Sequence, residues 1–282
     1  MKKLAVIGDP IGHSLGPLMW NAAFKALGLE KDFVYESLRV KSEELGSFVK
    51  KIREGAYIGA NVTIPHKIAI IHYLDRLAEQ ARLVGAVNAL YVEDGEVVGG
   101  NTDGEGALRA LVEHGVEIKE KRVLILGAGG AARAIAFTLA PRVKELIILN
   151  RTRERAEELS SEVLKLATKT RAGGLPIKEL DDVDVEMVIN CTSVGMKGAQ
   201  EGKSLVTKEM LRPDQIIMDV VYNPLETALL REAKSVGAMT ISGLDMLVYQ
   251  AVANFRRWTG REAPVDLMKR TVKERLYGHD RR

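Results

Sequence analysis

The chain has 282 residues, of which 46% are hydrophobic and 28% are charged, with 41 basic and 38 acidic side chains. This length and apolar content suit one large domain or two modest ones, and they exclude a disordered or collagen-like protein. A single cysteine cannot form an internal disulfide, so a reducing, cytoplasmic location is expected. No apolar stretch is long enough for a signal peptide or a membrane span, and a net charge of +3 does not indicate nucleic-acid binding. We therefore expect neither a membrane nor a nucleic acid as a partner.

The amino-terminal part alternates between strand and helix patterns, which indicates an α/β protein. Residues 3–8 predict a strand. Apolar residues between positions 15 and 27 recur at helical spacing, with Ser14 as the expected N-cap and Gly28 as the stop. Residues 86–98 predict a hairpin that turns at Asp94 and Gly95. Between these segments we expect a strand in DFVYESL, a helix in SEELGSFVKKIRE and a strand in YIGANVTI.

A second α/β series begins at Arg122 and has the order of a Rossmann-type domain. Helices are expected over residues 130–140 and 154–166, and amphipathic segments at 103–114 and 244–258 would lead into the domain and out of it. The expected strands lie in RVLILG, ELIILN, MVINCT and QIIMDVVY.

These patterns predict a two-lobed α/β protein with an N-terminal α/β substrate lobe and a Rossmann-type dinucleotide-binding domain. The substrate-binding lobe is expected to be discontinuous, over residues 1–102 and 244–282. The nucleotide-binding domain is expected over residues 103–243.

A G-x-G-x-x-A fingerprint, GAGGAA, follows directly after the strand RVLIL and opens a helix. Gly127 would make the tight turn, Gly129 would let the backbone approach a pyrophosphate, and Ala132 would allow close packing of helix on strand. A glycine-rich turn with a purely structural role is the alternative, but this placement between strand and helix favours nucleotide binding at the helix N-terminus. The expected phosphate-binding residues are Gly127, Ala128, Gly129, Gly130 and Ala131.

The end of the next strand indicates which dinucleotide is bound. An NAD-binding protein usually has an acidic residue there, about 20 residues after the first glycine. Here the position is Asn150, followed by Arg151, Thr152 and Arg155. Guanidinium groups suit a 2′-phosphate because they are always charged and donate in pairs. NADP is therefore the expected cofactor, although both arginines could simply be the solvated first turn of a helix.

Four further motifs lie ahead of the nucleotide-binding domain. They are GHSL at 12–15, NVTIPHK at 61–67, AVN at 86–88 and GNTD at 100–103. Each alone is typical of turn chemistry. Together, and with GAGGAAR, NRT, VYNP at 221–224 and GLDMLVYQA at 243–251, they resemble the shikimate dehydrogenase family over nearly the whole chain.

The resemblance implies an NADP-dependent oxidoreductase that acts on a CH–OH group. Its small-molecule substrate would be 3-dehydroshikimate, reduced reversibly to shikimate in the pathway to chorismate and the aromatic amino acids. The oligomeric state expected is a monomer or a homodimer. The alternatives are a quinate/shikimate dehydrogenase with relaxed substrate or cofactor preference, a folate-linked dehydrogenase, and a non-catalytic NADP-binding redox sensor.

The resemblance also implies the site residues. Lys67 and Asp103 match the catalytic pair of the family. Ser14 would lie near the substrate carboxylate, and Asn88, Asp103 and Gln250 would surround the ring hydroxyls. Other expected substrate contacts are Thr63, Lys67 and Tyr222. The expected residues at the nicotinamide end of the cofactor are Thr192, Val221, Gly243 and Met246.

The chemistry of a ketone reduction gives roles to the catalytic pair. Lys67 can donate the proton or stabilise the developing alkoxide, and Asp103 can equally serve to hold Lys67 and a substrate hydroxyl in position. The histidines and the single cysteine show no metal-ligand spacing, so no metal site is expected. Cys191 is expected to be a small buried hydrophobe rather than a nucleophile.

One position departs from the family pattern. The family usually has S-x-S near the carboxylate site, whereas this chain has Gly16 in place of the second serine. Loss of this hydroxyl donor would weaken the binding of a carboxylate by about 1.5–3 kcal/mol if no water replaced it. Glycine is also expected to leave room beside C1 of the ring, where quinate has an extra hydroxyl. A broadened tolerance for quinate is therefore a hypothesis.

Overall fold

The computed structural model describes residues 1–12, 14–166, 169–175 and 184–278. Within these residues, no helix combines the length and the apolar character needed to cross a membrane.

The chain divides into two compact units, which we call unit 1 and unit 2. Unit 1 comprises Met1–Thr102 and Gln250–Arg282, and unit 2 comprises Asp103–Tyr249. Helix α8 (Gly243–Thr259) contributes residues 243–249 to unit 2 and the remainder to unit 1. The ligand that each unit binds is not tested by this division. The residue ranges expected for the substrate-binding lobe and for the nucleotide-binding domain therefore stay predictions.

The sheet of unit 1 combines parallel and antiparallel strands. Its strand order over the described residues is β2-β1-β3-β5-β6-β4, with antiparallel pairing where β5 meets β3 and β6. The other pairs are parallel. The strands are β1 (Lys2–Gly8), β2 (Phe33–Arg39), β3 (Gly59–Val62), β4 (Arg76–Leu77), β5 (Ala89–Glu93) and β6 (Glu96–Gly100).

One of the antiparallel pairs, β5 with β6, is the predicted hairpin, which is confirmed. Strands β5 and β6 are joined by Asp94 and Gly95, with φ of 54° and 81°. Positive φ at both central positions is the requirement of a type I′ turn, whose twist matches that of the flanking strands. An Asp-Gly pair meets it at low cost because both residues tolerate the left-handed region.

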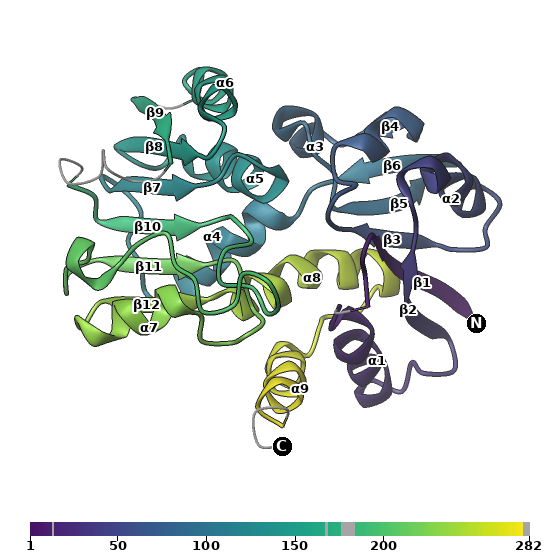
Figure 1. Ribbon diagram of the computed structural model, residues 1–282. Helices are drawn as coiled ribbons and strands as arrows, with labels where there is room; N and C mark the ends of the chain where they lie inside the picture. Colours follow the sequence, from purple (N-terminus) through teal and green to yellow (C-terminus); the bar gives the residue numbers. More distant parts are fainter. Residues whose placement is uncertain (13, 167–168, 176–183, 279–282) are drawn as a thin grey trace. The chain divides into compact units, whose positions relative to one another are not determined.

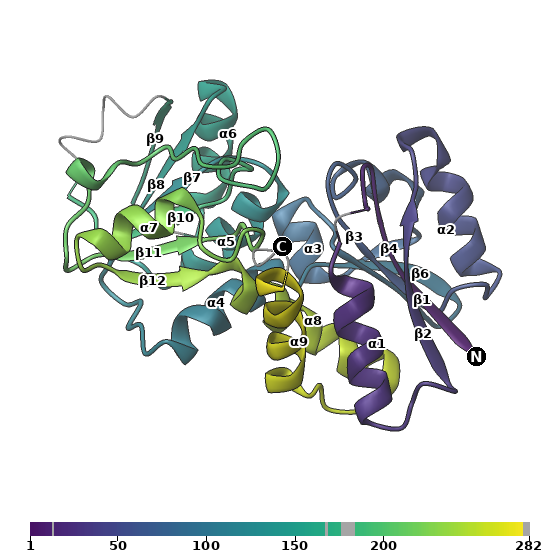
Figure 2. The ribbon, with the colours of Figure 1, turned by 60° about the horizontal axis from the view of Figure 1, so that its bottom comes forward.

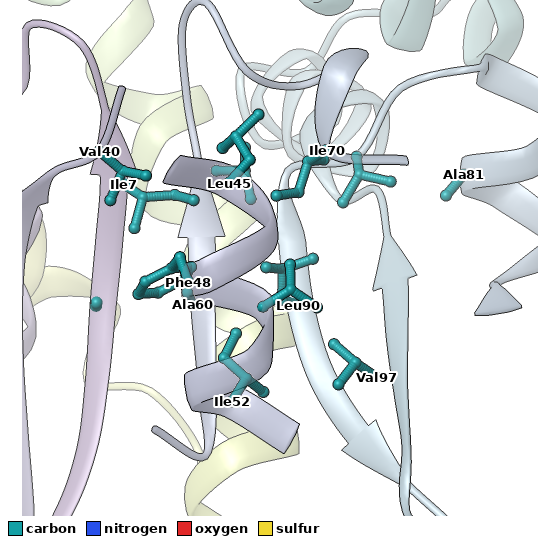
Figure 3. Packing of buried hydrophobic residues seen from close by; sticks show 14 residues of the cluster. Ile7, Val40, Leu45, Phe48, Ile52, Ala60, Ile70, Ala81, Leu90 and Val97 are labelled. Atoms are coloured by element: carbon teal, nitrogen blue, oxygen red, sulfur yellow. The ribbon is translucent and has the colours of Figure 1, made fainter. Parts of the chain in front are cut away.

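One face of this sheet is covered by α2 (Leu45–Arg53). Its buried side chains Leu45, Phe48 and Ile52 pack on strand residues that include Ile7 and Leu90 (Figure 3). The other helical segments of unit 1 are α1 (Gly16–Ala26), η1 (Ser42–Glu44), η2 (Ala69–Tyr73), α3 (Glu79–Val84) and α9 (Val265–Tyr277).

A second core in unit 1 is aromatic. Trp20 of α1 stacks on Tyr35 of β2 at 4.8 Å between ring centroids and on Phe255 of α8 at 5.1 Å. Trp258 completes the cluster at 5.2 Å from Trp20. Helix α9 packs beside α1 (Figure 2). The described residues from 250 onwards, 250–278, thus belong to unit 1 because their apolar side chains, such as Phe255 and Trp258, pack in its core.

The start of α1 differs from the expectation. The N-cap is Leu15, and Ser14 lies one residue earlier, where its Oγ accepts a hydrogen bond from the amide of Gly16 at 3.3 Å. The prediction of Ser14 as N-cap is therefore wrong. At the other end the predicted stop is confirmed, since Gly28 has φ of 68° just after the C-cap Leu27.

The sheet of unit 2 is entirely parallel over the described residues, in the order β12-β11-β10-β7-β8-β9 (Figure 1). Counted along the chain, this is the doubly wound order of a dinucleotide-binding fold. The predicted Rossmann-type domain is confirmed, but two of its edge strands, β9 and β12, were not predicted. The strands are β7 (Arg122–Leu126), β8 (Glu145–Asn150), β9 (Thr170–Gly174), β10 (Met187–Asn190), β11 (Ile216–Asp219) and β12 (Met239–Ser242).

Strand order reverses between β7 and β10, and ligands of such sheets bind beyond the carboxyl ends of the strands at this point. One side of the sheet forms a core with α7 through Leu124, Ile217 and Leu229. The helical segments of unit 2, besides the start of α8, are α4 (Asp103–Glu113), α5 (Gly130–Leu139), α6 (Arg153–Val163), η3 (Lys208–Met210) and α7 (Ala228–Ser235).

We predict that Trp20→Ala destabilises the chain by about 3–5 kcal/mol, because it empties the centre of the aromatic core. Trp20 is 1% exposed, whereas Tyr277 at the end of α9 is 59% exposed. Urea unfolding of Tyr277→Ala provides the control, with an expected change within about 0.5 kcal/mol. Equal losses in the two variants would contradict the assignment of this core.

Candidate active site

Lys67 lies in a turn after β3 whose backbone is tied down on several sides. The amide of His66 donates to the carbonyl of Thr63 at 2.9 Å, and the buried His66 ring donates from Nε2 to the carbonyl of Val40 at 2.6 Å. The carbonyl of Lys67 itself accepts from the amide of Val87 at 2.7 Å. Lys67 is half-buried. Its flexible side chain thus starts from a fixed backbone position in unit 1.

Asn88 is the centre of a polar network in unit 1. Its side chain, 2% exposed, accepts from the amide of Thr102 at 2.8 Å through Oδ1. Its Nδ2 donates to Oγ1 of Thr102 at 3.1 Å and to Oε1 of Gln250 at 3.3 Å. The structure therefore brings together two residues, Asn88 and Gln250, that are 162 positions apart in the sequence.

Three residues that support this network were missed in the sequence. Nδ2 of Asn61 donates to the carbonyl of Asn88 at 3.1 Å, and the hydroxyl of Tyr35 donates to Oδ1 of Asn61 at 2.7 Å. Nδ2 of Asn254 donates to Oγ1 of Thr102 at 3.2 Å. Asn61 lies within NVTIPHK, and Asn254 is one helical turn after Gln250, so motif membership and helical spacing were the available signals.

Gly16 is not beside open space. A Cβ built on Gly16 would lie 3.3 Å from Oγ of Ser14 and 3.3 Å from Cε1 of Tyr35, tighter than ordinary contact. The expectation that glycine leaves room at this position is therefore wrong at the Cβ, because the ring of Tyr35 occupies one side. Ser14 is half-buried.

Asp103 is the first residue of α4 in unit 2 and is 5% exposed. A carboxylate in the first turn is favoured by the helix dipole. The next residue, Gly104, packs against α5 so closely that a Cβ would lie 2.0 Å from Oγ1 of Thr138 and 2.5 Å from the carbonyl oxygen of Ala134. Only glycine permits this approach, which fixes the backbone beside Asp103.

The glycine-rich turn after β7 has the form of a phosphate cradle. Gly127 has φ of +109°, and its amide donates to the carbonyl of Leu149 at 2.7 Å. Gly129 is the N-cap of α5, and a Cβ there would meet no atom within 4 Å. Ala128 lies between them, and Gly130 and Ala131 begin α5, where the first amides of a helix lack helical partners. Open space beside such amides fits the diphosphate of a dinucleotide.

The residues after β8 are exposed. Nδ2 of Asn150 donates to the carbonyl of Thr152, the N-cap of α6, at 2.8 Å. Arg151, Thr152 and Arg155 are exposed, and among the described residues no carboxylate pairs with either arginine. In contrast, Arg153 pairs with Glu157 at 2.9 Å. As far as the described residues are concerned, both guanidinium groups are thus open to an external anion such as a 2′-phosphate.

The residues expected at the nicotinamide end lie beyond β10 and β11 and at the start of α8. Thr192 donates from its amide and its hydroxyl to Oδ1 of Asn190, at 3.1 and 2.7 Å. Gly243 has no space for a side chain, since a Cβ would lie 2.3 Å from the carbonyl oxygen of Val220. Val221 and Met246 are buried, and Tyr222 is half-buried.

Asp219 is a buried acid that the sequence reading missed. It is 0% exposed at the end of β11, where Oδ1 accepts from Nδ2 of Asn190 at 2.9 Å and from the amide of Val221 at 3.0 Å. Its Oδ2 accepts from the hydroxyl of Thr227 at 2.6 Å. Burial raises the pKa of Asp219 to about 6, although these hydrogen bonds favour the charged form. The available signal in the sequence was an acidic residue directly after the apolar run IIM, within QIIMD.

The predicted site residues thus fall into two sets. Cys191 follows directly after β10 and is not an activated nucleophile, because burial and the negative charge of Asp219 raise the pKa of its thiol. In the part of the chain that the structure describes, no three His, Cys, Asp or Glu side chains are placed to hold a metal ion. Unit 1 holds Ser14, Thr63, Lys67, Asn88 and Gln250, and unit 2 holds Asp103, Tyr222 and all the predicted cofactor residues.

Comparison with known families matches three family models in chain order. Residues 6–90 match the shikimate dehydrogenase substrate binding domain. Residues 110–220 match shikimate / quinate 5-dehydrogenase, and residues 243–273 match the shikimate 5′-dehydrogenase C-terminal domain. The resemblance predicted from the motifs is confirmed.

Individual relatives align over nearly the whole chain. The shikimate dehydrogenase (NADP(+)) of Methanocaldococcus jannaschii is 44% identical, over 98% of this chain and 97% of the relative. A crystal structure of a shikimate dehydrogenase in complex with NADP+ has a TM-score of 0.90 at 43% identity, covering 98% of this chain and 96% of that one. The Listeria monocytogenes enzyme in complex with shikimate and NAD has a TM-score of 0.86 at 40% identity, covering 96% of each chain.

The fold is shared with an enzyme named for a different substrate. A quinate dehydrogenase from Corynebacterium glutamicum, in complex with NAD, has a TM-score of 0.84 at 30% identity, covering 96% of this chain and 98% of that one. Similarity of fold therefore leaves the choice between shikimate and quinate to individual side chains.

We predict that Asp219→Asn removes a pH-dependent loss of stability. The carboxyl binds its proton more tightly in the folded chain, with a pKa of about 6, than in the unfolded chain, where the value is about 3.9. The free energy of unfolding of the natural chain should therefore fall, relative to the variant, by about 2 kcal/mol as the pH rises from about 4 to about 7. Urea unfolding across this range measures the difference. Parallel pH profiles would show that Asp219 does not titrate in this way.

Proposed function

The chain belongs to the shikimate dehydrogenase family, and from this premise we propose that it catalyses the reversible NADPH-dependent reduction of 3-dehydroshikimate to shikimate. The observation that carries the proposal is the fixed polar arrangement around Asn88 in unit 1, which presents Asn88 and Gln250 together. A polyhydroxylated ring acid needs several such groups, because each hydroxyl must exchange its water for a protein partner.

Each substrate contact has a chemical role. Ser14 donates its hydroxyl to the carboxylate, and Asn88, Asp103 and Gln250 bind the ring hydroxyls. Thr63 and Tyr222 are further substrate contacts. Because the side chain of Asn88 already has its hydrogen bonds within unit 1, little conformational entropy is lost when the substrate binds. Such pre-organisation favours one orientation of the ring and hence one reacting carbon.

The proton is handled by the chain itself. NADPH, when bound, supplies the hydride to the carbonyl carbon. Lys67 lies on a fixed turn and, as an ammonium, stabilises the negative charge that develops on the carbonyl oxygen and donates a proton to it. Asp103 accepts a hydrogen bond from a substrate hydroxyl. In the reverse direction the same pair takes the proton from the hydroxyl of shikimate.

The cofactor contacts follow from unit 2. Amides of the turn over Gly127, Ala128, Gly129, Gly130 and Ala131 bind the pyrophosphate. Arg151 and Arg155, with Asn150 and Thr152, bind the 2′-phosphate, which NAD lacks. Thr192, Val221, Gly243 and Met246 surround the nicotinamide.

A quinate/shikimate dehydrogenase is the second candidate function, and the observation that favours it is Gly16. The chain lacks the second serine of the family pattern, so no serine side chain takes up space where quinate has its extra hydroxyl at C1. A non-catalytic redox sensor has less support because the chain keeps both Lys67 and Asp103. The cytoplasmic location and the monomer or homodimer remain predictions.

The proposed function is tested by the absorbance of NADPH at about 340 nm with shikimate or quinate as substrate and NADP or NAD as oxidant. We expect the highest kcat/KM with shikimate and NADP. A higher value with quinate would establish the second candidate. Tight NADPH binding without turnover of either acid would overturn both in favour of a sensor.

We predict that Lys67→Ala lowers kcat by roughly 10²–10⁴-fold, because the developing oxyanion loses its proton donor. The dissociation constant for NADP+ should stay within about twofold, since Lys67 contributes no cofactor contact in this assignment. The matched control is Lys51→Ala, which removes an exposed lysine side chain on α2. It should leave both kcat and the dissociation constant for NADP+ unchanged. An equal loss in kcat and in cofactor affinity would instead make Lys67 a binding residue.

We predict that Gly16→Ser lowers kcat/KM for quinate relative to shikimate by about tenfold, because the added side chain takes up space on the side of the site where quinate has its extra hydroxyl at C1. Gly16→Ala separates the effect of side-chain bulk from the effect of the hydroxyl. It adds a methyl group that crowds Tyr35, but it adds no hydroxyl. Steady-state kinetics with both acids measure the ratio. A ratio that is the same in all three proteins would end the quinate hypothesis.

A further inference from the structure

The carboxylate of Asp219 is buried without a cationic partner among the residues that the structure describes. Its three donors, Nδ2 of Asn190, the amide of Val221 and the hydroxyl of Thr227, are all neutral. The hydroxyl of Thr227 also accepts from the amide of Leu230, as the N-cap of α7. These donors stabilise a negative charge without neutralising it. The field of the carboxylate therefore extends into its surroundings.

This carboxylate is hydrogen-bonded to the ends of β10 and β11, two of the three segments assigned to the nicotinamide. It bonds directly to the amide of Val221, beyond β11. It also bonds to Asn190, whose Oδ1 accepts from the amide and hydroxyl of Thr192, beyond β10. One side chain thus holds the ends of two neighbouring strands in register. Both segments depend on Asp219 for their positions.

We propose that Asp219 is a positioning residue of the cofactor site and that its buried negative charge shifts the relative affinity of the site toward the oxidised dinucleotide. The inference rests on the proposed function, because that function places Thr192 and Val221 at the nicotinamide. Asp219 itself touches neither substrate nor cofactor in this assignment. It acts through the backbone and side chains it holds and through its charge.

The two forms of the cofactor differ in the charge of one ring. Oxidised nicotinamide has one positive charge and reduced nicotinamide is neutral, while both forms have the same phosphates and ribose groups. A buried carboxylate near this ring attracts the oxidised form, and the attraction is weakly screened in a low-dielectric interior. Contacts shared by the two forms cancel in the ratio of their dissociation constants. The ratio therefore isolates the charge of Asp219 from its positioning role.

The test compares the dissociation constants of NADP+ and NADPH, measured by isothermal titration calorimetry on the full chain without substrate, for the natural protein and Asp219→Asn. Asparagine suits the site, because its Oδ1 can keep the bonds from Asn190 and Val221 and its amide can donate to Oγ1 of Thr227. We expect NADP+ binding to weaken roughly tenfold more than NADPH binding. An equal change in both constants, or no change in either, would overturn the proposal.

Two further variants secure the result. Asp214→Asn removes a charge from an exposed position just before β11, where Asp214 pairs with Arg212, and it should leave the ratio unaltered. A shift as large as that of Asp219→Asn would overturn the proposal. Should Asp219→Asn fail to fold, Asp219→Ser removes the same charge with room for a water beside the three donors, and it should shift the ratio in the same direction.

Failure of this inference is distinguishable from failure of the proposed function. If the natural chain binds neither form, or oxidises no ring acid, the proposed function fails. If it binds both forms and oxidises shikimate, but Asp219→Asn leaves the ratio unchanged, only the inference about Asp219 fails. A readout in binding, rather than in turnover, keeps the two apart.

Discussion

The hydrogen-bonding requirement of one buried amide, the side chain of Asn88, organises the substrate half of the proposed site. Asn88 lies in the interior of unit 1, where an unsatisfied amide would cost about 1–3 kcal/mol for each lost partner. Its partners come from the residues after β6 and from α8, which are distant in the sequence. Satisfying Asn88 therefore brings Thr102 and Gln250 to it. The geometry that could receive a ring acid follows from a folding constraint.

Unit 2 also has a buried side chain that accepts hydrogen bonds from several segments, but this side chain, Asp219, is a carboxylate. Asp219 collects donors from β10, from the residues after β11 and from the start of α7, much as Asn88 collects partners in unit 1. The difference is that an amide network is neutral, whereas a carboxylate held by neutral donors keeps its charge. A neutral network can bind the uncharged ring hydroxyls without favouring either redox state of the cofactor. A charged one can also discriminate between the two forms of a cofactor.

Much of this architecture was predictable where local chemistry decides the structure. The Asp94-Gly95 hairpin and the turn at Gly127 were predicted correctly because few other residues adopt such backbone conformations. Strand β9 was missed because TRAGG has neither apolar alternation nor β-branched density, and it owes its structure to pairing with β8. Tertiary contacts of this kind leave no local pattern.

The supporting residues of the site were harder to predict than the contact residues. Tyr35 bonds to Asn61 and also fills the space beside Gly16, and neither role follows from its position in a strand. The expected cap at Ser14 failed because the helix begins later, at Gly16, so the hydroxyl meets a different amide. Motifs identify the groups that touch a ligand, whereas the groups that hold them are set by packing between distant segments.

The most direct test of where the two ligands bind uses the Asn88→Ala variant. The dissociation constants of shikimate and of NADP+ are measured, each ligand alone, for this variant and for the natural chain. If Asn88 in unit 1 contacts the substrate and the cofactor contacts lie in unit 2, the dissociation constant for shikimate should rise at least about tenfold. The constant for NADP+ should stay within about twofold. Weakening of both ligands to the same extent, or of NADP+ alone, would contradict the assignment.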